Sequence, residues 1–325
     1  MPNAKTGTIE ITDKKYPSLL SKALGVLQPS LGPKKLYYKG NWEKFFPAER
    51  DPAAAGNNCL AVVGSRRLTS YGRRATEQLV TEIAASGITI VSGFMYGGDE
   101  AAHSAAVRCG GKTIAVMPCG INIIFPEYQK ELYNEILENN GLILSEYEGD
   151  FLPQTWSFVQ RDRIVAGLAK AVLVTEASLN SGSLITANYA KKFGRKIFAL
   201  PGQITSDVAK GTTKLIKEGA EPVVEANDIL SFYKVLVNPH IGVGVIPGLT
   251  RNPVVGAQTL DSGLRQNDTE TSLEKNILEY LGREPMEVDS LARALCVPAA
   301  KLGTTLSLMH LKGLINLEGQ KYYLN

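Results

Sequence analysis

Six short apolar runs separated by amphipathic stretches dominate residues 57–233. The runs cover residues 60–63, 89–91, 113–117, 142–144, 171–174 and 196–200. Each is apolar at consecutive positions, so both faces of the expected strand are buried, as in a parallel sheet between two helical layers. The pattern predicts a doubly wound, mostly parallel α/β domain over 57–233.

The segments on either side of this domain follow different patterns. Residues 1–56 predict a short helix and an edge strand, which we interpret as an N-terminal extension packing on the core. Residues 234–271 are rich in Pro and Gly without periodicity, which indicates a linker. Residues 272–325 predict helices over 272–281, 288–294 and 298–311, then two apolar runs around a turn at 318–320. Helices followed by a hairpin predict a small C-terminal winged-helix domain.

Charge and cysteine usage exclude several classes of protein. The 325 residues carry 35 Lys and Arg against 32 Asp and Glu, a net charge of +3. A polyanion-binding site must therefore be local and not a broad cationic surface. The four cysteines form no CxxC pair, which argues against a zinc site or a disulfide framework. Without an apolar leader or a run of about 18 apolar residues, a cytoplasmic protein with no membrane association is expected.

Turns rich in Gly and Ser follow the predicted strands and should share one edge of the sheet. The candidates are Gly64, Ser65 and Arg66 after the first run, Ser92 and Gly93 after the second, and Gly120 after the third. Glycine lets backbone N–H groups approach a phosphate, and an arginine adds a bidentate donor. The alternative is that the glycines only form turns and the arginines face solvent.

Later segments extend the candidate site. Arg161 and Arg163 flank Asp162 and could clamp phosphates, although Asp162 could instead pair with one of them and leave one free cation. Ser181, Gly182 and Ser183 precede a predicted helix and could bind phosphate or serve as plain helix caps. Phe125 could stack on an unpaired base or pack in the core.

Enzymatic chemistry has weak support in the sequence. There is no Gly-x-Gly-x-x-Gly fingerprint and no Walker motif, so neither a dinucleotide cofactor nor ATP hydrolysis is expected. His103 could act as a base with Asp99, one helical turn away. We favour a structural interpretation, in which Asp99 caps a helix and His103 packs beneath the loop. No catalytic residue, cofactor or metal ligand is therefore assigned.

Taken together, these motifs resemble those of the DNA-processing protein A (DprA/Smf) family. The resemblance covers about 57–233 and the tail, and its motifs are Gly64-Ser65-Arg66, Ser92-Gly93 with Asp99, Gly120, Arg161-x-Arg163, Ser181-Gly182-Ser183 and Pro201-Gly202. It implies an extended Rossmann-like domain and a winged-helix tail. It also implies a homodimeric, non-enzymatic protein that binds single-stranded DNA, protects incoming DNA and loads the RecA recombinase in natural transformation.

The resemblance also implies roles for particular residues. Arg66, Arg161, Arg163 and Lys214 would contact phosphates, and Phe125 would stack on a base. Gly64, Ser65, Ser92, Gly93, Gly120 and residues 181–183 would shape the pocket. The chain departs from the family pattern at Asp162, where most members have Asn; this carboxylate should weaken DNA binding.

The sequence supports three more expectations: one further departure from the family pattern, a role for the tail and a competing function. The bulky Phe94 and Met95 should narrow the pocket. Residues 272–325 carry six basic and six acidic residues, so the tail is expected to contact protein more than duplex DNA. The competing function is a nucleotide hydrolase similar to the phosphoribohydrolases, with Glu176 or Asp99 as the acid. Those enzymes carry Pro-Gly-Gly-x-Gly-Thr-x-x-Glu, whereas Gln203 follows Pro201-Gly202 here.

Overall fold

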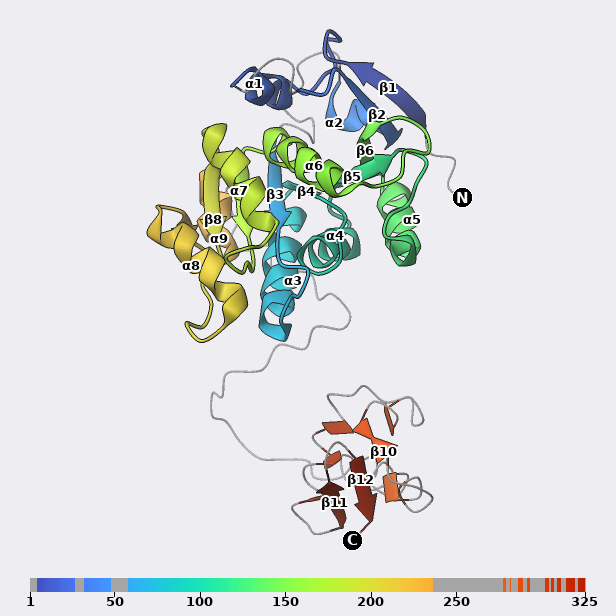
Figure 1. The fold of residues 1–325 in the computed structure, drawn as a ribbon, viewed down its shortest axis with the longest axis vertical. Helices are drawn as coiled ribbons and strands as arrows, with labels where there is room; N and C mark the ends of the chain where they lie inside the picture. The colour runs from blue at the N-terminus through green and yellow to red at the C-terminus, as the bar shows by residue number, and fades with distance from the viewer. Residues whose placement is uncertain are drawn as a thin grey trace, which may run out of the picture. The chain divides into compact units, whose positions relative to one another are not determined.

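The structure is a computed structural model whose chain divides into two compact units, Met1–Gly244 and Val245–Asn325 (Figure 1). It describes residues 5–26, 32–47, 58–235, 277–278, 281, 286–288, 291–292, 302–303, 305–306, 309–310, 314–318 and 321–324. Most of the predicted linker lies outside these residues. Among them, no helix combines the length and apolar character needed to cross a bilayer.

The first unit is built on a nine-stranded sheet with the order β1-β2-β6-β5-β4-β3-β7-β8-β9. Strands β3 to β9 are parallel to one another, whereas β2 runs antiparallel to both of its neighbours, β1 and β6. All six predicted runs form strands, so the doubly wound, mostly parallel sheet is confirmed. The strands are β1 (Thr6–Glu10), β2 (Lys35–Gly40), β3 (Cys59–Val63), β4 (Thr89–Ser92), β5 (Thr113–Gly120), β6 (Leu142–Tyr147), β7 (Ala171–Val174), β8 (Lys196–Ala199) and β9 (Glu221–Pro222).

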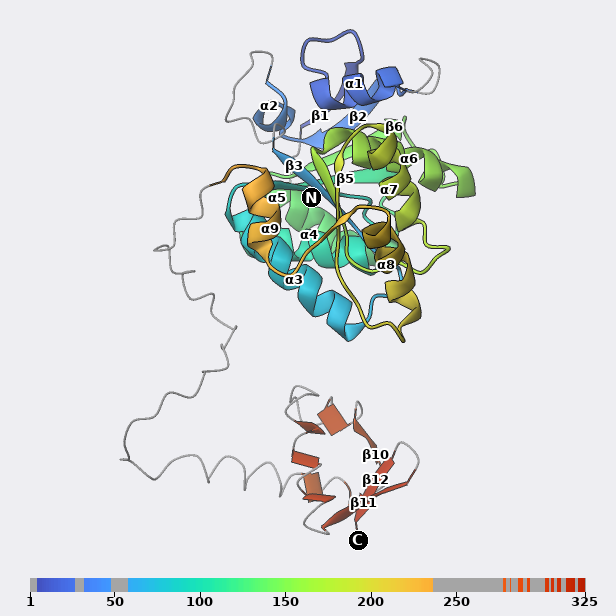
Figure 2. The same ribbon diagram turned by 90° about the vertical axis from the view of Figure 1, so that its left-hand side faces the viewer.

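Helices cover both faces of the sheet (Figure 2). One layer contains α1 (Ser18–Val26), α6 (Thr155–Leu168), α7 (Ser183–Lys192) and α8 (Lys210–Lys217). The opposite layer contains α3 (Ser70–Ala85), α4 (Gly98–Arg108), α5 (Lys130–Glu138) and α9 (Ala226–Phe232). Short 3₁₀ turns at Glu127–Gln129 and Asp207–Ala209 precede α5 and α8.

Alternate residues of each strand point into opposite cores, which explains why the predicted runs are apolar throughout. In β3, Ala61 and Val63 pack against the layer that contains α6, whereas Leu60 and Val62 pack against α3 and α4. All of these side chains are buried. The two cores fix the sheet between its helical layers and place the strand ends at one edge.

The N-terminal segment extends the sheet beyond its parallel part. Strand β2 pairs with β6 antiparallel, and α2 (Trp42–Phe45) follows it. Leu20 from α1, Leu36 from β2 and Phe45 from α2 are fully buried in the same core as α6. In its described residues, this segment is therefore continuous with the main core.

The strand order reverses direction beside β3. From β3 the chain proceeds outward through β4, β5 and β6, then returns to place β7 on the other side of β3 and continues to β8 and β9. The crevice at such a reversal, beyond the carboxyl ends of the strands, is the usual ligand position in open α/β sheets. The fold therefore directs attention to the loops after β3 and β7.

The second unit contains a three-stranded antiparallel sheet of β10 (Met286–Glu287), β12 (Lys321–Leu324) and β11 (Ile315–Glu318), in that order. Strands β11 and β12 form the predicted hairpin, with Glu318 opposite Lys321. Helical residues occur in each of the three segments where helices were predicted. Ile277, Leu291 and Leu306 are buried together with Ile315, so helices and hairpin share a core.

Candidate nucleic-acid interface

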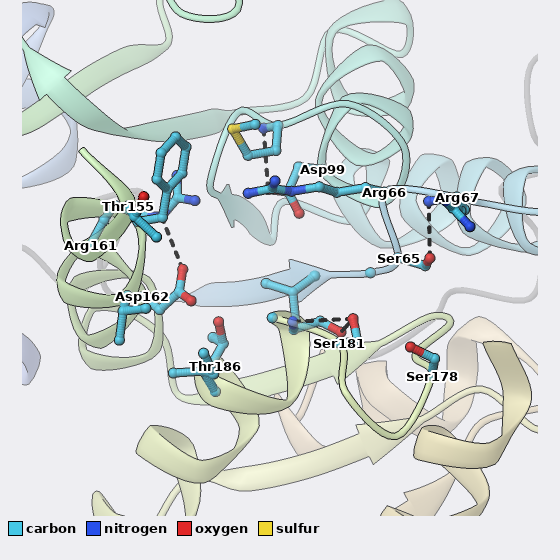
Figure 3. Close-up of a pocket in the computed structure, with 18 residues that line it drawn as sticks. Ser65, Arg66, Arg67, Asp99, Thr155, Arg161, Asp162, Ser178, Ser181 and Thr186 are labelled. Carbon is cyan, nitrogen blue, oxygen red and sulfur yellow. Dashed lines mark hydrogen bonds and ion pairs between the residues drawn. The ribbon is translucent and has the colours of Figure 1, made fainter. Parts of the chain in front are cut away.

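A cavity of about 390 Å³ opens where the strand order reverses (Figure 3). Its walls come from the loop after β3, the loop after β4, the first half of α6 and the start of α7. The lining residues are Val63, Gly64, Ser65, Arg66, Arg67, Met95, Asp99, Thr155, Phe158, Val159, Arg161, Asp162, Ser178, Ser181, Gly182, Ser183, Ile185 and Thr186. Segments far apart in sequence thus form one concave site.

Glycine allows the loops after β3 and β4 to pack backbone against backbone. A Cβ atom at Gly98 would lie 2.6 Å from the Cα atom of Gly64. The Gly98 N–H donates to the Ser65 carbonyl at 3.1 Å, and Gly97 has a φ of 84°. These contacts hold the loop between β3 and α3 against the loop after β4. Ser65 and Arg66 of that first loop line the cavity as a result.

Glu176 joins the loop after β7 to the start of α3. Its carboxylate accepts hydrogen bonds from the Thr69 N–H at 2.8 Å and the Thr69 hydroxyl at 2.5 Å. The same hydroxyl accepts from the Gly72 N–H and so caps α3. Glu176 is buried and does not line the cavity. Its carboxylate therefore holds the loop after β7 against the start of α3, beside the cavity.

Arg66 lies at the mouth of the cavity between two aromatic rings. Its guanidinium carbon is 5.5 Å from the centre of the Tyr96 ring and 5.3 Å from that of Phe158. Both distances are within the range of cation–π attraction. Figure 3 shows the side chain extending across the cavity. Arg66 is solvent-exposed, so its donors can reach a phosphate.

Arg161 is buried in the floor of the cavity, so it cannot serve as the expected open phosphate clamp. Its guanidinium donates to the Gly93 carbonyl, to the Val116 carbonyl at 2.7 Å and to Asp162 at 3.0 Å. Only 4% of its side chain is exposed. The carbonyl of Gly93, directly after β4, and that of Val116, within β5, hold this arginine in place in the cavity floor.

Arg163 is not among the residues that line the cavity, so the expected paired clamp of Arg161 and Arg163 does not form there. It forms an ion pair with Glu146 at 2.6 Å and donates to the Gln160 carbonyl at 2.7 Å. Its side chain is 6% exposed. In a helix, residues two positions apart face different directions, so Arg161 and Arg163 cannot grip the same phosphate. Asp162 pairs with Arg161, as the alternative interpretation expected, but Arg163 is not left as a free cation, because it pairs with Glu146.

Ser181 to Ser183 lie where expected, at the start of α7 and in the cavity wall. The Ser181 and Ser183 hydroxyls are 2.8 Å apart, and the Ser183 N–H points toward the Ser181 oxygen at 3.4 Å. A helix N-terminus carries partial positive charge and binds anions. The first turns of α6 and α7 both border the cavity, so their dipoles favour negative charge there.

Asp99 and His103 occupy buried structural positions, which confirms that His103 packs beneath the loop. The Met95 N–H donates to Asp99 at 3.3 Å, and desolvation raises the pKa of this carboxyl. His103 Nδ1 lies 2.7 Å from the Thr113 hydroxyl, and desolvation lowers its pKa to about 3. Asp99 lines the cavity, but His103 does not.

Four other predicted site residues support the cavity from outside it or lie apart from it. Ser92 donates to the Val62 carbonyl, and a Cβ atom at Gly93 would meet the Arg161 guanidinium. At Gly120 a Cβ atom would collide with the Gly149 carbonyl. Lys214 is exposed on α8 and pairs with Glu218 at 3.9 Å. None of these four lines the cavity.

Of the bulky side chains near the site, some pack in the core and others line the cavity. Phe125, the predicted stacking residue, is half-buried and contacts the Phe158 ring at 5.9 Å, so it lies behind the cavity wall. Phe94 is buried, with a φ of 58°, and points into the core against Tyr133. Only Met95 of the bulky pair lines the cavity. The expectation that Phe94 narrows the pocket was therefore wrong.

Phe158, Arg67 and Asp162 line the cavity but were not assigned to the site from the sequence. Phe158 and Asp162 are four residues apart on α6, hence on one face of the helix. Their spacing of four residues, about one helical turn, is the sequence signal that could have identified them as neighbours on one face. Arg67 directly follows Arg66, and its N–H donates to the Ser65 hydroxyl at 3.0 Å.

Comparison with known proteins places this cavity in a family. The family model described as DNA recombination-mediator protein A matches residues 7–234, and the one described as DprA winged helix domain matches residues 264–319. The chain belongs to the DprA/Smf family. Protein Smf of Synechocystis sp. is 33% identical to this family member over 326 residues, covering 95% of this chain and 78% of that protein.

Two solved DprA structures share the fold. That of Streptococcus pneumoniae DprA superposes with a TM-score of 0.61 and 37% identity, over 70% of this chain and 74% of that one. That of Helicobacter pylori DNA processing protein A gives a TM-score of 0.60 and 31% identity, over 71% and 97%. The latter structure concerns that protein's single-stranded DNA binding mode. Both matches support the DprA assignment and the Rossmann-like fold.

Proposed function

We propose that this DprA/Smf protein binds single-stranded DNA in the cavity beside β3 and β7 and does not cleave it. The observation that carries the proposal is the placement of Arg66 between Tyr96 and Phe158 at the cavity mouth. A guanidinium can bind phosphate, and aromatic rings can stack on unpaired bases. The relative from Helicobacter pylori, whose structure concerns single-stranded DNA binding, supports the same ligand.

Local groups, more than net charge, should provide the affinity. Residues 57–233 contain 17 Lys and Arg against 18 Asp and Glu, so no broad cationic surface is available. Arg66, Arg67 and the first turns of α6 and α7 supply positive potential at one place. Binding should therefore weaken with salt, but with a moderate slope that corresponds to few phosphate contacts.

The geometry favours binding over nucleotide hydrolysis. Both oxygens of Glu176, one candidate acid, accept hydrogen bonds from Thr69. Asp99, the other, is buried and accepts from the Met95 N–H. His103 is buried beneath the loop with a low pKa, so it remains neutral at physiological pH. These groups are already committed to holding the loops around the cavity.

The proposal includes a role in recombination. We propose that the protein acts in the cytoplasm as a homodimer, protects incoming DNA during natural transformation and loads RecA onto it. The family model's description as a recombination mediator supports this role. Light scattering on the purified chain measures the oligomeric state. ATP hydrolysis by RecA on single-stranded DNA, with and without this protein, measures loading.

Replacement of Arg66 tests DNA binding directly. We expect Arg66→Ala to weaken binding to a fluorescent oligo-dT by about 10- to 100-fold, since a charge-assisted contact contributes about 1.5–3 kcal/mol. The salt slope should fall by about one unit. Fluorescence anisotropy at several salt concentrations measures both. A duplex of the same length should bind more weakly, because its bases are not free to stack.

Arg108→Ala is the matched control for this experiment. Arg108 is exposed at the far end of α4 from the cavity and pairs with Glu77 at 3.2 Å. Its removal deletes the same charge without touching the cavity, so binding should change less than about twofold. Equal effects of the two substitutions, or unchanged binding by Arg66→Ala, would contradict the proposed site.

A further inference from the structure

The cavity is divided into a cationic mouth and an acceptor-rich interior. Arg66 and Arg67 are exposed at the mouth. Asp99 and Asp162 are the two carboxylates among the cavity-lining residues. Arg161 also lines the interior, but its Nε group already pairs with Asp162 and its Nη1 group donates to backbone carbonyls. A phosphate is therefore better stabilised at the mouth than in the interior, where Asp99 and Asp162 offset the charge of Arg161.

Asp162 offers unused hydrogen-bond acceptors in this interior. Its Oδ1 atom accepts from the Arg161 Nε at 3.0 Å, and its side chain is 14% exposed. Figure 3 shows the carboxylate pointing into the cavity. An ionised carboxylate has about four lone-pair sites, so one ion pair leaves most of its acceptor capacity available. A ligand group beside Asp162 should consequently be a hydrogen-bond donor.

Phe158 provides an apolar surface next to this carboxylate. Phe158 and Asp162 lie one helical turn apart on α6, and both line the cavity. A cavity of about 390 Å³ lies in the size range that holds whole small ligands and is larger than a phosphate group requires. An aromatic ring beside a carboxylate matches the face and the donor edge of a nucleobase.

Resting on the proposed function, in which a base of the bound strand enters the cavity, we infer that Asp162 selects guanine as that base. Guanine presents two adjacent donors, N1–H and N2–H, that can bond both oxygens of a carboxylate. Thymine presents a single N3–H between two carbonyl oxygens, which a carboxylate repels. Adenine and cytosine each present one amino group beside an acceptor nitrogen. The phosphates of the strand would lie outside, near Arg66 and Arg67.

Oligonucleotides that differ in single bases test the selection. The probe is a fluorescent oligo-dT in which isolated positions are replaced by dG. We expect the unaltered protein to bind this probe at least about five times more tightly than oligo-dT, which corresponds to one bidentate base contact. Inosine, which lacks the guanine amino group, should lose much of this gain. The comparison changes only the DNA, so it does not depend on how a protein variant folds.

Asp162→Asn tests the role of the carboxylate itself. The amide keeps the size of the side chain but offers one acceptor in place of two, so the affinities for the dG and dT hosts should converge to within about twofold. Asp207→Asn removes an exposed carboxylate that does not line the cavity and should preserve the preference. A cooperative thermal unfolding transition in each variant will establish that the variant is folded.

Acidification provides a second readout on the unaltered protein. Desolvation raises the pKa of Asp162 to about 6 against the opposing effect of Arg161, while Asp99 and Arg66 are the other charged groups that act on it. Protonation removes acceptor sites. The guanine preference should therefore decline as the pH falls through about 6.

The possible results separate this inference from the proposed function. Salt-dependent binding with equal affinity for dG and dT hosts overturns guanine selection and leaves single-strand binding intact. A preference retained in full by Asp162→Asn also overturns the role of this residue. Failure to bind any oligonucleotide overturns both. Loss of the preference in Asp162→Asn, with inosine intermediate, supports the inference.

Discussion

Gly98 illustrates how single residues set the distance between the loops of the site. A Cβ atom added to Gly98 would lie 2.6, 2.8 and 3.0 Å from the Cα, N and C atoms of Gly64. Backbone atoms cannot rotate aside as a flexible side chain can. The requirement for glycine at this position is therefore one of space.

We expect Gly98→Ala to lower the free energy of unfolding by about 1–3 kcal/mol, the usual cost of overpacking. Gly182→Ala is the control, because a Cβ atom there has no neighbour within 4 Å and the backbone is already helical, with a φ of −58°. This variant should stay within about 0.5 kcal/mol of the unaltered protein. Urea denaturation measures both. Equal stability of the two variants would show that the loops can separate without cost.

The arginines show what residue type alone leaves open. Arg66, Arg161 and Arg163 all looked like phosphate ligands in the sequence. The structure exposes Arg66 at the cavity mouth, buries Arg161 in the cavity floor and pairs Arg163 with Glu146. Carbonyl and carboxylate partners from other elements decide which arginine is buried and which can reach a ligand.

At the scale of elements, the start of α3 depends on a residue more than a hundred positions away in the sequence. Thr69 caps the helix through its hydroxyl, and the same group donates to Glu176 after β7. The link holds the loops after β3 and β7 together on the two sides of the strand-order reversal. The cavity therefore depends on a connection between two elements, beyond the properties of either loop.

A double-mutant cycle on Thr69→Ala and Glu176→Gln should reveal this connection. Loss of the cap alone costs about 1 kcal/mol. We expect a coupling energy of about 0.5–3 kcal/mol between the two sites, because they share hydrogen bonds. Denaturant unfolding of the single and double variants measures it.

Thr81→Ala is the control for the cycle. Its hydroxyl donates to the Glu77 carbonyl within α3, at 2.7 Å. This substitution should cost less than about 0.5 kcal/mol and be additive with Glu176→Gln. Strict additivity of Thr69→Ala with Glu176→Gln would instead show that the two loops are held independently.

At the scale of the whole molecule, the N-terminal segment is built into the first unit. Leu20 packs against Gly167 of α6, where an added Cβ atom would lie 2.6 Å from the Leu20 Cδ1 atom. Leu36, Trp42 and Phe45 are also buried. Burial of each large apolar side chain contributes about 1.5–3 kcal/mol, so together they match a large part of the roughly 5–15 kcal/mol typical of a domain.

Two truncations test this organisation. Removal of residues 1–56 should leave an unfolded or aggregating chain, because it uncovers the core beside α6 and the edge of β6. Removal of residues 245–325 should leave the thermal midpoint of the first unit within a few degrees, because the two units are separately compact. Size-exclusion chromatography and thermal unfolding measure both. A stable, monodisperse chain lacking residues 1–56 would disprove the structural role of this segment.

The sequence by itself determined the strands, the glycine-rich turns and the C-terminal hairpin. These features depend on short local runs of apolar residues and on backbone conformations that glycine or turn residues favour. The motif set was also sufficient to indicate the DprA/Smf family, which the family models confirm. Such signals lie within a few neighbouring residues or recur along the chain.

Only the tertiary structure decided which side chains face the cavity. Phe158 and Asp162 line it, whereas Phe125 lies behind its wall and Lys214 lies outside its lining. The direction of a side chain depends on the phase of its helix and on hydrogen bonds to segments distant in sequence, such as Arg161 to the carbonyls after β4 and in β5. No local pattern records these partners, because they meet only when the sheet is assembled.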